Sequence, residues 1–102
     1  MTEKGLMHEI MLALSEQGHT VFRANVGLMF TKDGRPIRTG LPVGFSDLFG
    51  FTKDGRPFFF EVKTETGRVS GHQSAFLDAM HNRGAIAAVV RSVDMAMMIV
   101  NQ

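Results

Sequence analysis

Apolar residues recur every three to four positions near the start of the chain, which is the spacing of one face of an amphipathic helix. This pattern predicts a helix over residues 3–16, with Thr2 as its N-cap and Gly18 just beyond its end. The face that we expect to be buried carries five apolar side chains: Leu6, Met7, Ile10, Met11 and Leu14.

Two further helices are predicted in the second half of the chain. Ser70 and Gln73 have the spacing of a capping box, so a helix should begin there and continue to about Asn82. A short last helix is predicted near the C-terminus. Either Ser92 or Asp94 could cap it.

Strand-like segments separate these helices. Alternating residues rich in valine and phenylalanine predict a strand over residues 20–30, and residues 45–52 and 58–64 predict two more. The continuous apolar run 85–90 is typical of a strand that is covered on both faces. The predicted order is α-β-β-β-α-β-α, which indicates an α/β fold with a mixed central sheet flanked by helices.

A heptapeptide occurs twice between these strands. The sequence Phe-Thr-Lys-Asp-Gly-Arg-Pro occupies residues 30–36 and again residues 51–57. Each copy contains Asp-Gly, which favours a hairpin turn because glycine adopts a positive φ without steric cost. Each copy is therefore predicted to form a turn between strands that exposes one lysine and one arginine.

The composition is that of a single globular domain spanning residues 1–102. Hydrophobic residues make up 44% of the chain and charged residues 21%, which excludes a disordered protein. Cysteine is absent, which excludes disulfides, thiolate metal sites and cysteine nucleophiles. The longest apolar run is too short to span a bilayer and the N-terminus has no signal-peptide pattern, so we expect a cytoplasmic protein without a membrane partner.

Charge is distributed unevenly, although the formal net charge is only +1. The segment from Arg23 to Arg68 carries +3, whereas the rest of the chain carries −2. A mild basic stripe can therefore lie along one face. An ordinary solvated surface explains the same numbers, so charge alone does not decide between the two.

Three charged residues lie within segments that are predicted to be buried strands. Asp47 belongs to the first strand of the central hairpin, and Glu61 and Lys63 belong to the second. Glu61 and Lys63 share one face because side chains alternate along a strand. The Asp-Gly turn lies midway between Asp47 and Glu61, so these two carboxylates should lie nearly opposite each other.

This arrangement suits a divalent metal. Two carboxylates offer hard oxygen ligands to Mg²⁺ or Mn²⁺, which retain several waters. A bound metal lowers the pKa of a water and neutralises charge on a phosphoryl oxygen, and the lysine could orient either group. The alternative is a cross-strand ion pair on an exposed sheet face. The three phenylalanines before Glu61 argue against that, because a strand buried among them would carry a costly unpaired charge.

Two more polar residues could join this patch. Glu3 extends the apolar stripe of the first helix, although the helix dipole explains a first-turn glutamate equally well. Gln73 is fully explained by the capping box, yet its helix begins shortly after the strand that carries Glu61. The four histidines show no clustering that would indicate a zinc site.

The order of these acidic, lysine and glutamine residues along the chain resembles that of the PD-(D/E)xK nuclease superfamily and, within it, the VRR-NUC family. The motifs that carry the resemblance are a helical glutamate at position 3, Arg-Ala-Asn-Val-Gly at 23–27, Gly-Phe-Ser-Asp-Leu at 44–48, Glu-Val-Lys at 61–63 and Ser-x-x-Gln at 70–73. The resemblance covers nearly the whole chain, to about Val90.

The resemblance implies a restriction-endonuclease-like core and a metal-dependent DNA endonuclease. The chain is similar to small stand-alone proteins of phages and bacteria that act as homodimers on branched DNA such as four-way (Holliday) junctions, in the cytoplasm of a bacterial or phage-infected cell. Seven basic side chains of the central segment are the candidate DNA contacts: Arg23, Lys32, Arg35, Arg38, Lys53, Arg56 and Arg68.

The resemblance also implies roles for single residues. Asp47 and Glu61 would bind Mg²⁺ or Mn²⁺, with the backbone carbonyl of Val62 as a third ligand. Lys63 would position or activate the attacking water. The remaining implied roles are those of Gln73, which would orient Lys63 or a phosphate, and of Glu3, which would act through the metal or its waters.

Two other functions stay open. A nuclease-like module could bind DNA without cutting it, but two acids near a phosphate repel DNA unless a cation screens them. A small interaction protein could use exposed methionine and phenylalanine side chains, but most of the methionines have helix-core spacing. For a homodimer, the methionine-rich segment 95–100 is a candidate interface, although packing on its own sheet explains it equally well.

Overall fold

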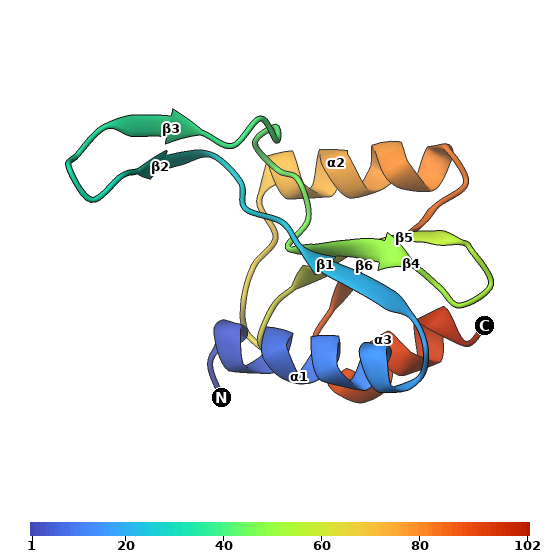
Figure 1. Ribbon diagram of the computed structural model, residues 1–102. Coiled ribbons are helices and arrows are strands. Elements are labelled where there is room, and N and C mark those ends of the chain that lie inside the picture. The colour runs from blue at the N-terminus through green and yellow to red at the C-terminus, as the bar shows by residue number, and fades with distance from the viewer.

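The computed structural model describes residues 1–102. Along the chain the elements are α1 (Glu3–Glu16), β1 (Thr20–Arg23), β2 (Leu28–Phe30), β3 (Pro36–Arg38), β4 (Leu48–Phe51), β5 (Pro57–Val62), α2 (Gly71–Asn82), β6 (Ile86–Val90) and α3 (Val93–Val100). Strands β1, β4, β5 and β6 form one sheet in that order, in which only the β5–β6 pair is parallel. Figure 1 shows α1 and α3 on one face of the sheet and α2 on the other. The predicted α/β fold with a mixed sheet between helices is confirmed.

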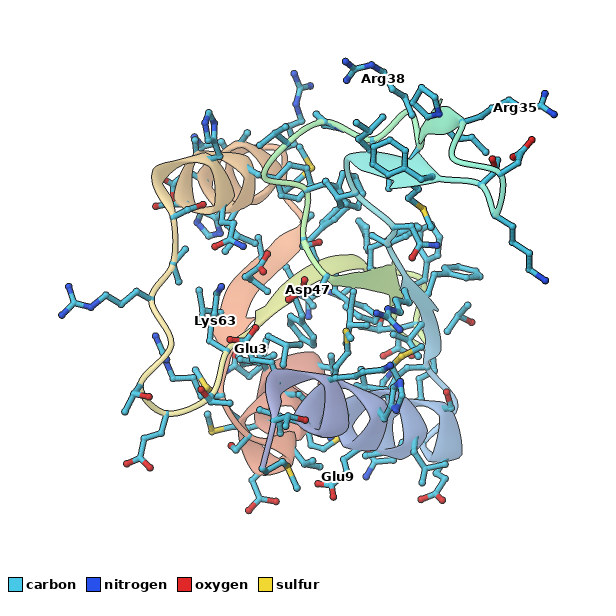
Figure 2. All side chains as sticks on the ribbon, turned by 90° about the vertical axis from the view of Figure 1, so that its left-hand side faces the viewer. Glu3, Glu9, Arg35, Arg38, Asp47 and Lys63 are labelled. Carbon is cyan, nitrogen blue, oxygen red and sulfur yellow. The ribbon has the colours of Figure 1, made fainter.

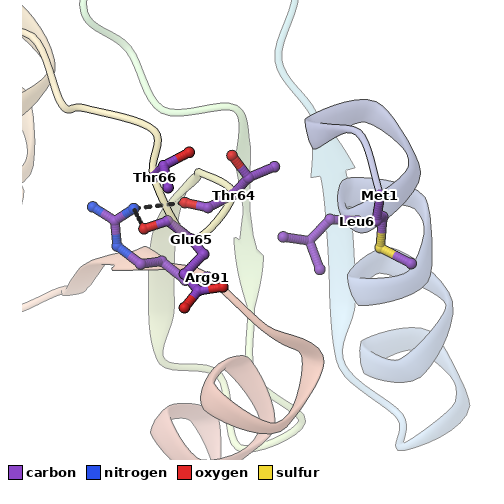
Figure 3. A pocket seen from close by; sticks show the side chains of 6 residues that line it. All are labelled: Met1, Leu6, Thr64, Glu65, Thr66 and Arg91. Carbon is purple, nitrogen blue, oxygen red and sulfur yellow. Dashed lines mark hydrogen bonds between the residues drawn. The ribbon is translucent and has the colours of Figure 1, made fainter.

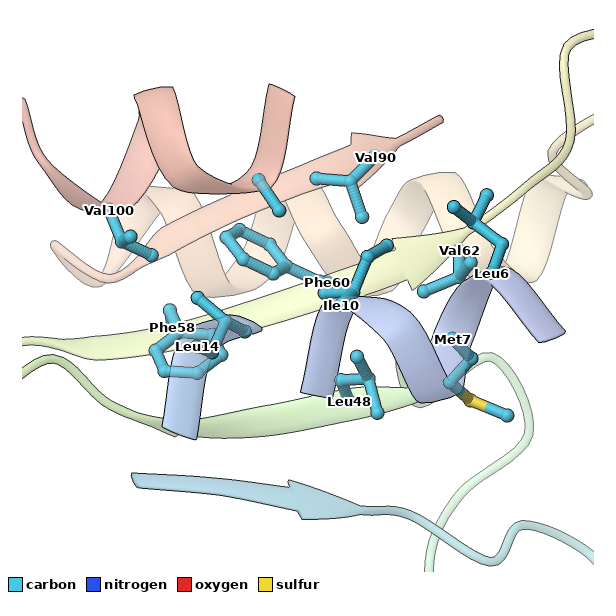
Figure 4. Packing of buried hydrophobic residues seen from close by; sticks show 11 residues of the cluster. Leu6, Met7, Ile10, Leu14, Leu48, Phe58, Phe60, Val62, Val90 and Val100 are labelled. Carbon is cyan, nitrogen blue, oxygen red and sulfur yellow. The ribbon is translucent and has the colours of Figure 1, made fainter. Parts of the chain in front are cut away.

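The first helix supplies most of one wall of the core. It begins as predicted, because Thr2 Oγ1 accepts a hydrogen bond from Gly5 N at 3.0 Å. Its inward face is the predicted apolar stripe, and Ile10 and Leu14 are fully buried. Figure 4 shows these side chains lying over Phe58 and Phe60 of β5, which belong to the same buried cluster. Burial of this kind stabilises the domain by about 1.5–3 kcal/mol for each large side chain.

The central hairpin has two different faces. Phe58 and Phe60 point toward α1 and α3, whereas Phe59 points toward α2. Phe45 and Phe76 meet Phe59 on that second face, with ring centroids 4.6 Å apart for Phe45 and Phe76. A strand that is apolar on both faces must be covered on both sides. The sheet is therefore fixed between its two helical layers.

The predicted strand over residues 20–30 is wrong, because two separate strands occupy it. The main-sheet ladder stops at Ala24, whose N–H donates to the carbonyl of Asp47 at 2.8 Å. Gly27 has a φ of +94°, which redirects the chain away from the sheet. β2 then pairs with β3 in a sheet of its own. Five strands, rather than three, therefore precede α2.

The two copies of the heptapeptide form the same turn, as predicted. In both, the backbone N–H of arginine donates to the threonine hydroxyl, at 3.0 Å for Arg35 and 3.1 Å for Arg56. Both glycines have a positive φ, +84° at Gly34 and +87° at Gly55. One copy joins β4 to β5 in the core. The other joins β2 to β3, a hairpin that projects from the body of the molecule (Figure 1).

The remaining helices also begin where the sequence indicates. Ser70 and Gln73 form both hydrogen bonds of the capping box at the start of α2. Of the two candidates for the cap of α3, it is Ser92 that accepts a hydrogen bond from Met95 N. Strand β6 is covered by α2 and α3, as the apolar run predicts. None of the helices is long and apolar enough to cross a membrane.

Gly50 holds β1 against β4, and its replacement by alanine is expected to be strongly destabilising. A Cβ at this position would lie 1.9 Å from the carbonyl oxygen of Thr20 on the paired strand. The backbones would have to separate, at a cost of about 3 kcal/mol. Gly71→Ala is the matched control, because its Cβ would meet nothing within 4 Å. Urea denaturation should show a lower midpoint for Gly50→Ala alone, and equal midpoints would contradict this account.

Candidate active site

Two carboxylates face each other at one end of the central hairpin. The register pairs Leu48 with Phe60, so Asp47 and Glu61 are the next opposed pair, as the sequence predicts. Asp47 Oδ2 accepts a hydrogen bond from the N–H of Val62 at 2.9 Å. This bond continues the ladder with a side chain instead of a carbonyl. The Asp47 carboxylate is therefore held over the end of β5.

Glu61 is the more buried of the two carboxylates, with only 1% of its surface exposed. Its Oε1 accepts a hydrogen bond from the side-chain amide of Gln73 at 2.9 Å. The Gln73 carbonyl oxygen accepts at the same time from the N–H of Ser70, at 2.9 Å. Gln73 therefore caps α2, as predicted, and faces the site, where its amide bonds to Glu61 and not to Lys63. The other oxygen of Glu61, Oε2, is buried and has no hydrogen-bond partner.

The environment of Glu61 opposes its ionisation. Burial, and after it the neighbouring Asp47 carboxylate, raise the pKa of Glu61 to about 8. Lys63 lowers this pKa and Glu3 raises it, both through charge. In the absence of a cation, Glu61 is therefore protonated at neutral pH.

Lys63 and Glu3 meet at Gly67, in the loop that follows β5. A Cβ on Gly67 would lie 3.3 Å from Glu3 Oε2 and 3.3 Å from both Cβ and Cδ of Lys63. Figure 2 shows Glu3, Lys63 and Asp47 close together on one side of the molecule, whereas Glu9 points away from them. The first-turn glutamate therefore reaches the same patch as the strand residues.

Arg91 holds this loop in place, and nothing in the sequence pattern indicates it. Its Nη1 donates to the carbonyls of Thr64 at 2.6 Å and Gly67 at 2.8 Å. Beside it, a pocket of about 410 Å³ opens between the loop and the start of α1, where Met1 and Leu6 line the other wall (Figure 3). The arginine thus fixes the backbone that packs on Lys63 and Glu3. Only the tertiary contact shows this role.

Neither of the two pockets of the structure includes the carboxylate pair. The second pocket, about 270 Å³, lies between strand β6 and the C-terminus. Asp47 and Lys63 are half-buried at the surface instead. An enclosed pocket is the usual site for a small molecule. A site that reaches the surface through Asp47 and Lys63, with Glu61 buried behind them, leaves room for an extended substrate.

Side chains supply only part of the oxygen ligands that a divalent cation needs at this site. No group of three or more histidine, aspartate or glutamate side chains is arranged as a metal site. Asp47 and Glu61 supply two carboxylates, and the Val62 carbonyl lies between Glu61 and Lys63 in the chain. Waters complete the coordination of Mg²⁺ in sites of this kind. A cation here would give Glu61 Oε2 a partner and offset the repulsion that raises its pKa.

The predicted DNA contacts do not form one stripe. Arg23 ends β1 beside Leu48, and Arg68 follows Gly67, so both lie at the carboxylate end of the sheet. Lys53 and Arg56 lie in the β4–β5 turn at the other end of the strands, roughly 15–20 Å away. The other three basic side chains are on the β2–β3 hairpin: Lys32, Arg35 and Arg38.

The buried Glu61 predicts a falling stability of the metal-free protein as pH rises. Its pKa is about 8 in the folded protein and 4.5 for an unperturbed glutamate, so the folded state binds the extra proton between these values. The contribution of this proton to the free energy of unfolding is a few kcal/mol. It is fully present below about pH 4.5 and is lost as the pH rises toward 8. Urea midpoints measured in EDTA across this range should fall for the wild type and stay nearly level for Glu61→Gln. Parallel curves for the two proteins would contradict the burial of a protonated Glu61.

Comparison with known proteins gives one family. A family model described as the VRR-NUC domain matches residues 15–94. A solved structure named "VRR_NUC domain" is 22% identical with a TM-score of 0.69, and the match covers 100% of this chain and 98% of that chain. A second, named "VRR_NUC domain protein", is 16% identical with a TM-score of 0.71 and coverages of 100% and 87%. At these identities the two structures establish the shared fold. No curated protein sequence matches the chain.

Proposed function

Because the chain belongs to the VRR-NUC family, which is nuclease-related and generally depends on divalent metals, we propose that it is an Mg²⁺- or Mn²⁺-dependent endonuclease that hydrolyses phosphodiester bonds in branched DNA. One observation carries the proposal. The Asp47 and Glu61 carboxylates lie opposite each other at the end of a sheet, with Lys63 one residue beyond the strand and Gln73 bonded to Glu61.

Asp47 and Glu61 would hold the metal, with the carbonyl of Val62 as the third protein ligand. When bound, such an ion supplies positive charge to a phosphoryl oxygen and lowers the pKa of a water. The Val62 N–H fixes Asp47 Oδ2, and the Gln73 amide fixes Glu61 Oε1. Both carboxylates are therefore oriented before substrate arrives, which is the condition for electrostatic catalysis.

Lys63 and Glu3 would act on the substrate side of the site. The Lys63 ammonium would orient the attacking water or hold a phosphate oxygen. Glu3, on the far side of Gly67, would bind waters of the same site. A Cβ at Gly67 would require these two side chains to give way by a few tenths of an ångström, so glycine allows both to pack against the loop.

The surroundings favour a phosphate backbone as the substrate. Figure 1 shows that α1 and α2 both begin at the end of the sheet that carries the carboxylates. The N-terminus of a helix carries partial positive charge and free N–H groups, which attract anions. Arg23 and Arg68 lie at the same end. Asp47 and Lys63 reach the surface outside both pockets, which suits a long polymer better than a small molecule.

We further propose that the working form is a homodimer. A two-fold axis would double the basic surface and present two sites in symmetric register, as a junction with its own two-fold symmetry requires. Segment 95–100 packs Ala96 and Val100 into its own core and exposes Met98, so it offers little apolar surface to a partner. β1 is a better candidate, since it is a free edge strand that carries the half-exposed Phe22. Light scattering at micromolar concentration tests the assembly, and a strict monomer would exclude it.

A cleavage panel tests the enzymatic proposal. Single-stranded, duplex, flap and four-way-junction DNA are incubated with Mg²⁺, Mn²⁺ or EDTA. We expect cleavage only with metal, and faster cleavage of the branched substrates. Binding without cleavage under all metal conditions would instead identify a non-cleaving DNA-binding module. Equal cleavage of junction and linear duplex would remove the preference for branched DNA but leave the nuclease.

A further inference from the structure

The β2–β3 hairpin exposes apolar side chains on both of its faces. Phe30 is 66% exposed, and Leu28, Met29 and Ile37 are each about half exposed. Successive residues of a strand point to opposite faces, so neither face of this ribbon is polar. A contiguous exposed apolar surface of this kind marks an interaction site.

The hairpin gains no cover from the rest of the molecule. It forms a sheet of its own, separate from the main sheet. The same heptapeptide turn in the β4–β5 hairpin is followed by Phe58 and Phe60, which are completely buried. An isolated two-stranded hairpin is marginally stable in water. The ribbon therefore has the construction of an arm that is covered by a partner.

The charge of the hairpin indicates which class of partner it fits. Between Ala24 and Ser46 the only charged residues are Lys32, Asp33, Arg35 and Arg38, which together carry +2. Two such arms packed against each other would repel. A polyanion with apolar faces, which is nucleic acid with its phosphates and bases, complements both properties.

The arm is anchored beside the carboxylate pair. Its first strand leaves the main sheet at Ala24, whose N–H donates to the Asp47 carbonyl. The chain returns through Gly44, where a Cβ would lie 2.4 Å from the carbonyl oxygen of His72 at the start of α2. Figures 1 and 2 show the arm projecting on the same side of the molecule as Asp47, Lys63 and Glu3.

We propose that the β2–β3 hairpin is a DNA-binding arm that enters a groove next to the cleaved phosphate and places Phe30 against base faces. The inference rests on the proposed function and assigns its DNA contact to a specific element. A two-stranded ribbon fits the major groove. At a branch point the bases are more easily unstacked, so apolar side chains reach their faces at lower cost than in linear duplex. Lys32 and Arg38 contact the flanking phosphates.

The duplicated heptapeptide provides a matched pair of variants. Phe30→Ala changes the arm, and Phe51→Ala makes the same change in the same heptapeptide at the far end of the sheet. Phe51 is 51% exposed, so it is comparable to Phe30. Binding to labelled four-way-junction and linear duplex DNA is measured by fluorescence anisotropy in EDTA, where no cleavage occurs. Thermal melting and light scattering of both variants are measured in parallel.

We expect the arm variant to bind junction DNA about tenfold more weakly, the loss typical of one stacked base, while the far-end variant binds like wild type. Both variants should melt like the wild type. Equal binding by the two variants, or no DNA binding by the wild type, would overturn the proposal. A change of molar mass in the arm variant with unchanged DNA affinity would overturn it too, and would show an interface between copies. If the wild type binds through the arm but cuts nothing, only the endonuclease proposal fails.

Discussion

Replacing Glu61 by glutamine is expected to abolish metal-dependent cleavage and, at the same time, to stabilise the metal-free protein above neutral pH. Glutamine has the shape of glutamate and can still accept the hydrogen bond from Gln73 at Oε1. It removes the charge that a divalent metal needs. A metal supplies several kcal/mol of transition-state stabilisation, so its loss should lower the rate roughly a thousandfold or more.

The gain in stability comes from removing the same buried charge. Burial and the adjacent Asp47 carboxylate raise the pKa of Glu61 to about 8. The wild type must therefore bury either an unfavourable charge or a proton that the unfolded chain would release. The glutamine variant is free of both. Activity and stability should move in opposite directions at this position, as is usual where a functional site carries repulsive charges.

The measurement combines initial cleavage rates with urea midpoints at pH 8, each with Mg²⁺ and with EDTA. Glu9→Gln is the control, because Glu9 is an exposed carboxylate on the outer side of α1 (Figure 2). It should leave both quantities unchanged. Mg²⁺ should raise the midpoint of the wild type and not that of Glu61→Gln. A Glu61→Gln protein that cleaves at a near-normal rate would remove Glu61 from the metal site.

Local patterns predicted the elements whose partners are adjacent in sequence. The turn at Asp54 and Gly55 fixes the hairpin register, and from that register Asp47 falls opposite Glu61. The capping box likewise fixed the start of α2, and with it Gln73. In each case the deciding interaction lies within a few residues, so composition and spacing carry enough information.

The wrong prediction of one strand over residues 20–30 shows what local patterns cannot predict. Alternation of apolar residues indicates a strand but not which strand it pairs with. Gly27 alone marks the point where the chain leaves the main sheet, and an isolated glycine in a strand pattern is compatible with a bulge as well. The exposed faces of Leu28 and Phe30 could not be distinguished from core positions without the fold.

Long-range contacts account for the features of the site and of the rest of the fold that the sequence did not indicate. Arg91 reaches the carbonyls of Thr64 and Gly67 from a position more than twenty residues away in the chain. His19 is buried and its Nδ1 accepts a hydrogen bond from the N–H of Lys53, although an isolated histidine in a turn suggests a surface residue. Such contacts arise only when the whole domain is assembled.

Lys63→Ala is expected to reduce the rate of cleavage by about 10²–10⁴-fold, the usual contribution of a positioned proton-transfer or water-orienting group. Its effect on DNA affinity should be small. One ammonium is a minor part of the phosphate contacts that we propose for Arg23, Arg68 and the hairpin, so the salt slope of binding should change by at most about 1.

Removing Lys63 should also change the pKa of Glu61. The charge of Lys63 lowers the pKa of Glu61, so its removal leaves the carboxyl more reluctant to ionise and therefore a poorer ligand for a metal. Residual activity of Lys63→Ala should consequently require a higher pH and more Mg²⁺ than the wild type. Lys63→Arg keeps the charge and should restore the metal dependence, although not the full rate, because a guanidinium has a different shape.

Single-turnover rates at saturating enzyme and dissociation constants in EDTA separate these effects. Arg83→Ala is the control, since Arg83 is an exposed basic residue at the C-cap of α2, the end of that helix away from the carboxylates. A Lys63→Ala protein that binds junction DNA far more weakly, yet cleaves at the wild-type rate once saturated, would make Lys63 a DNA anchor. The chemical step would then depend on the carboxylate pair and its metal alone.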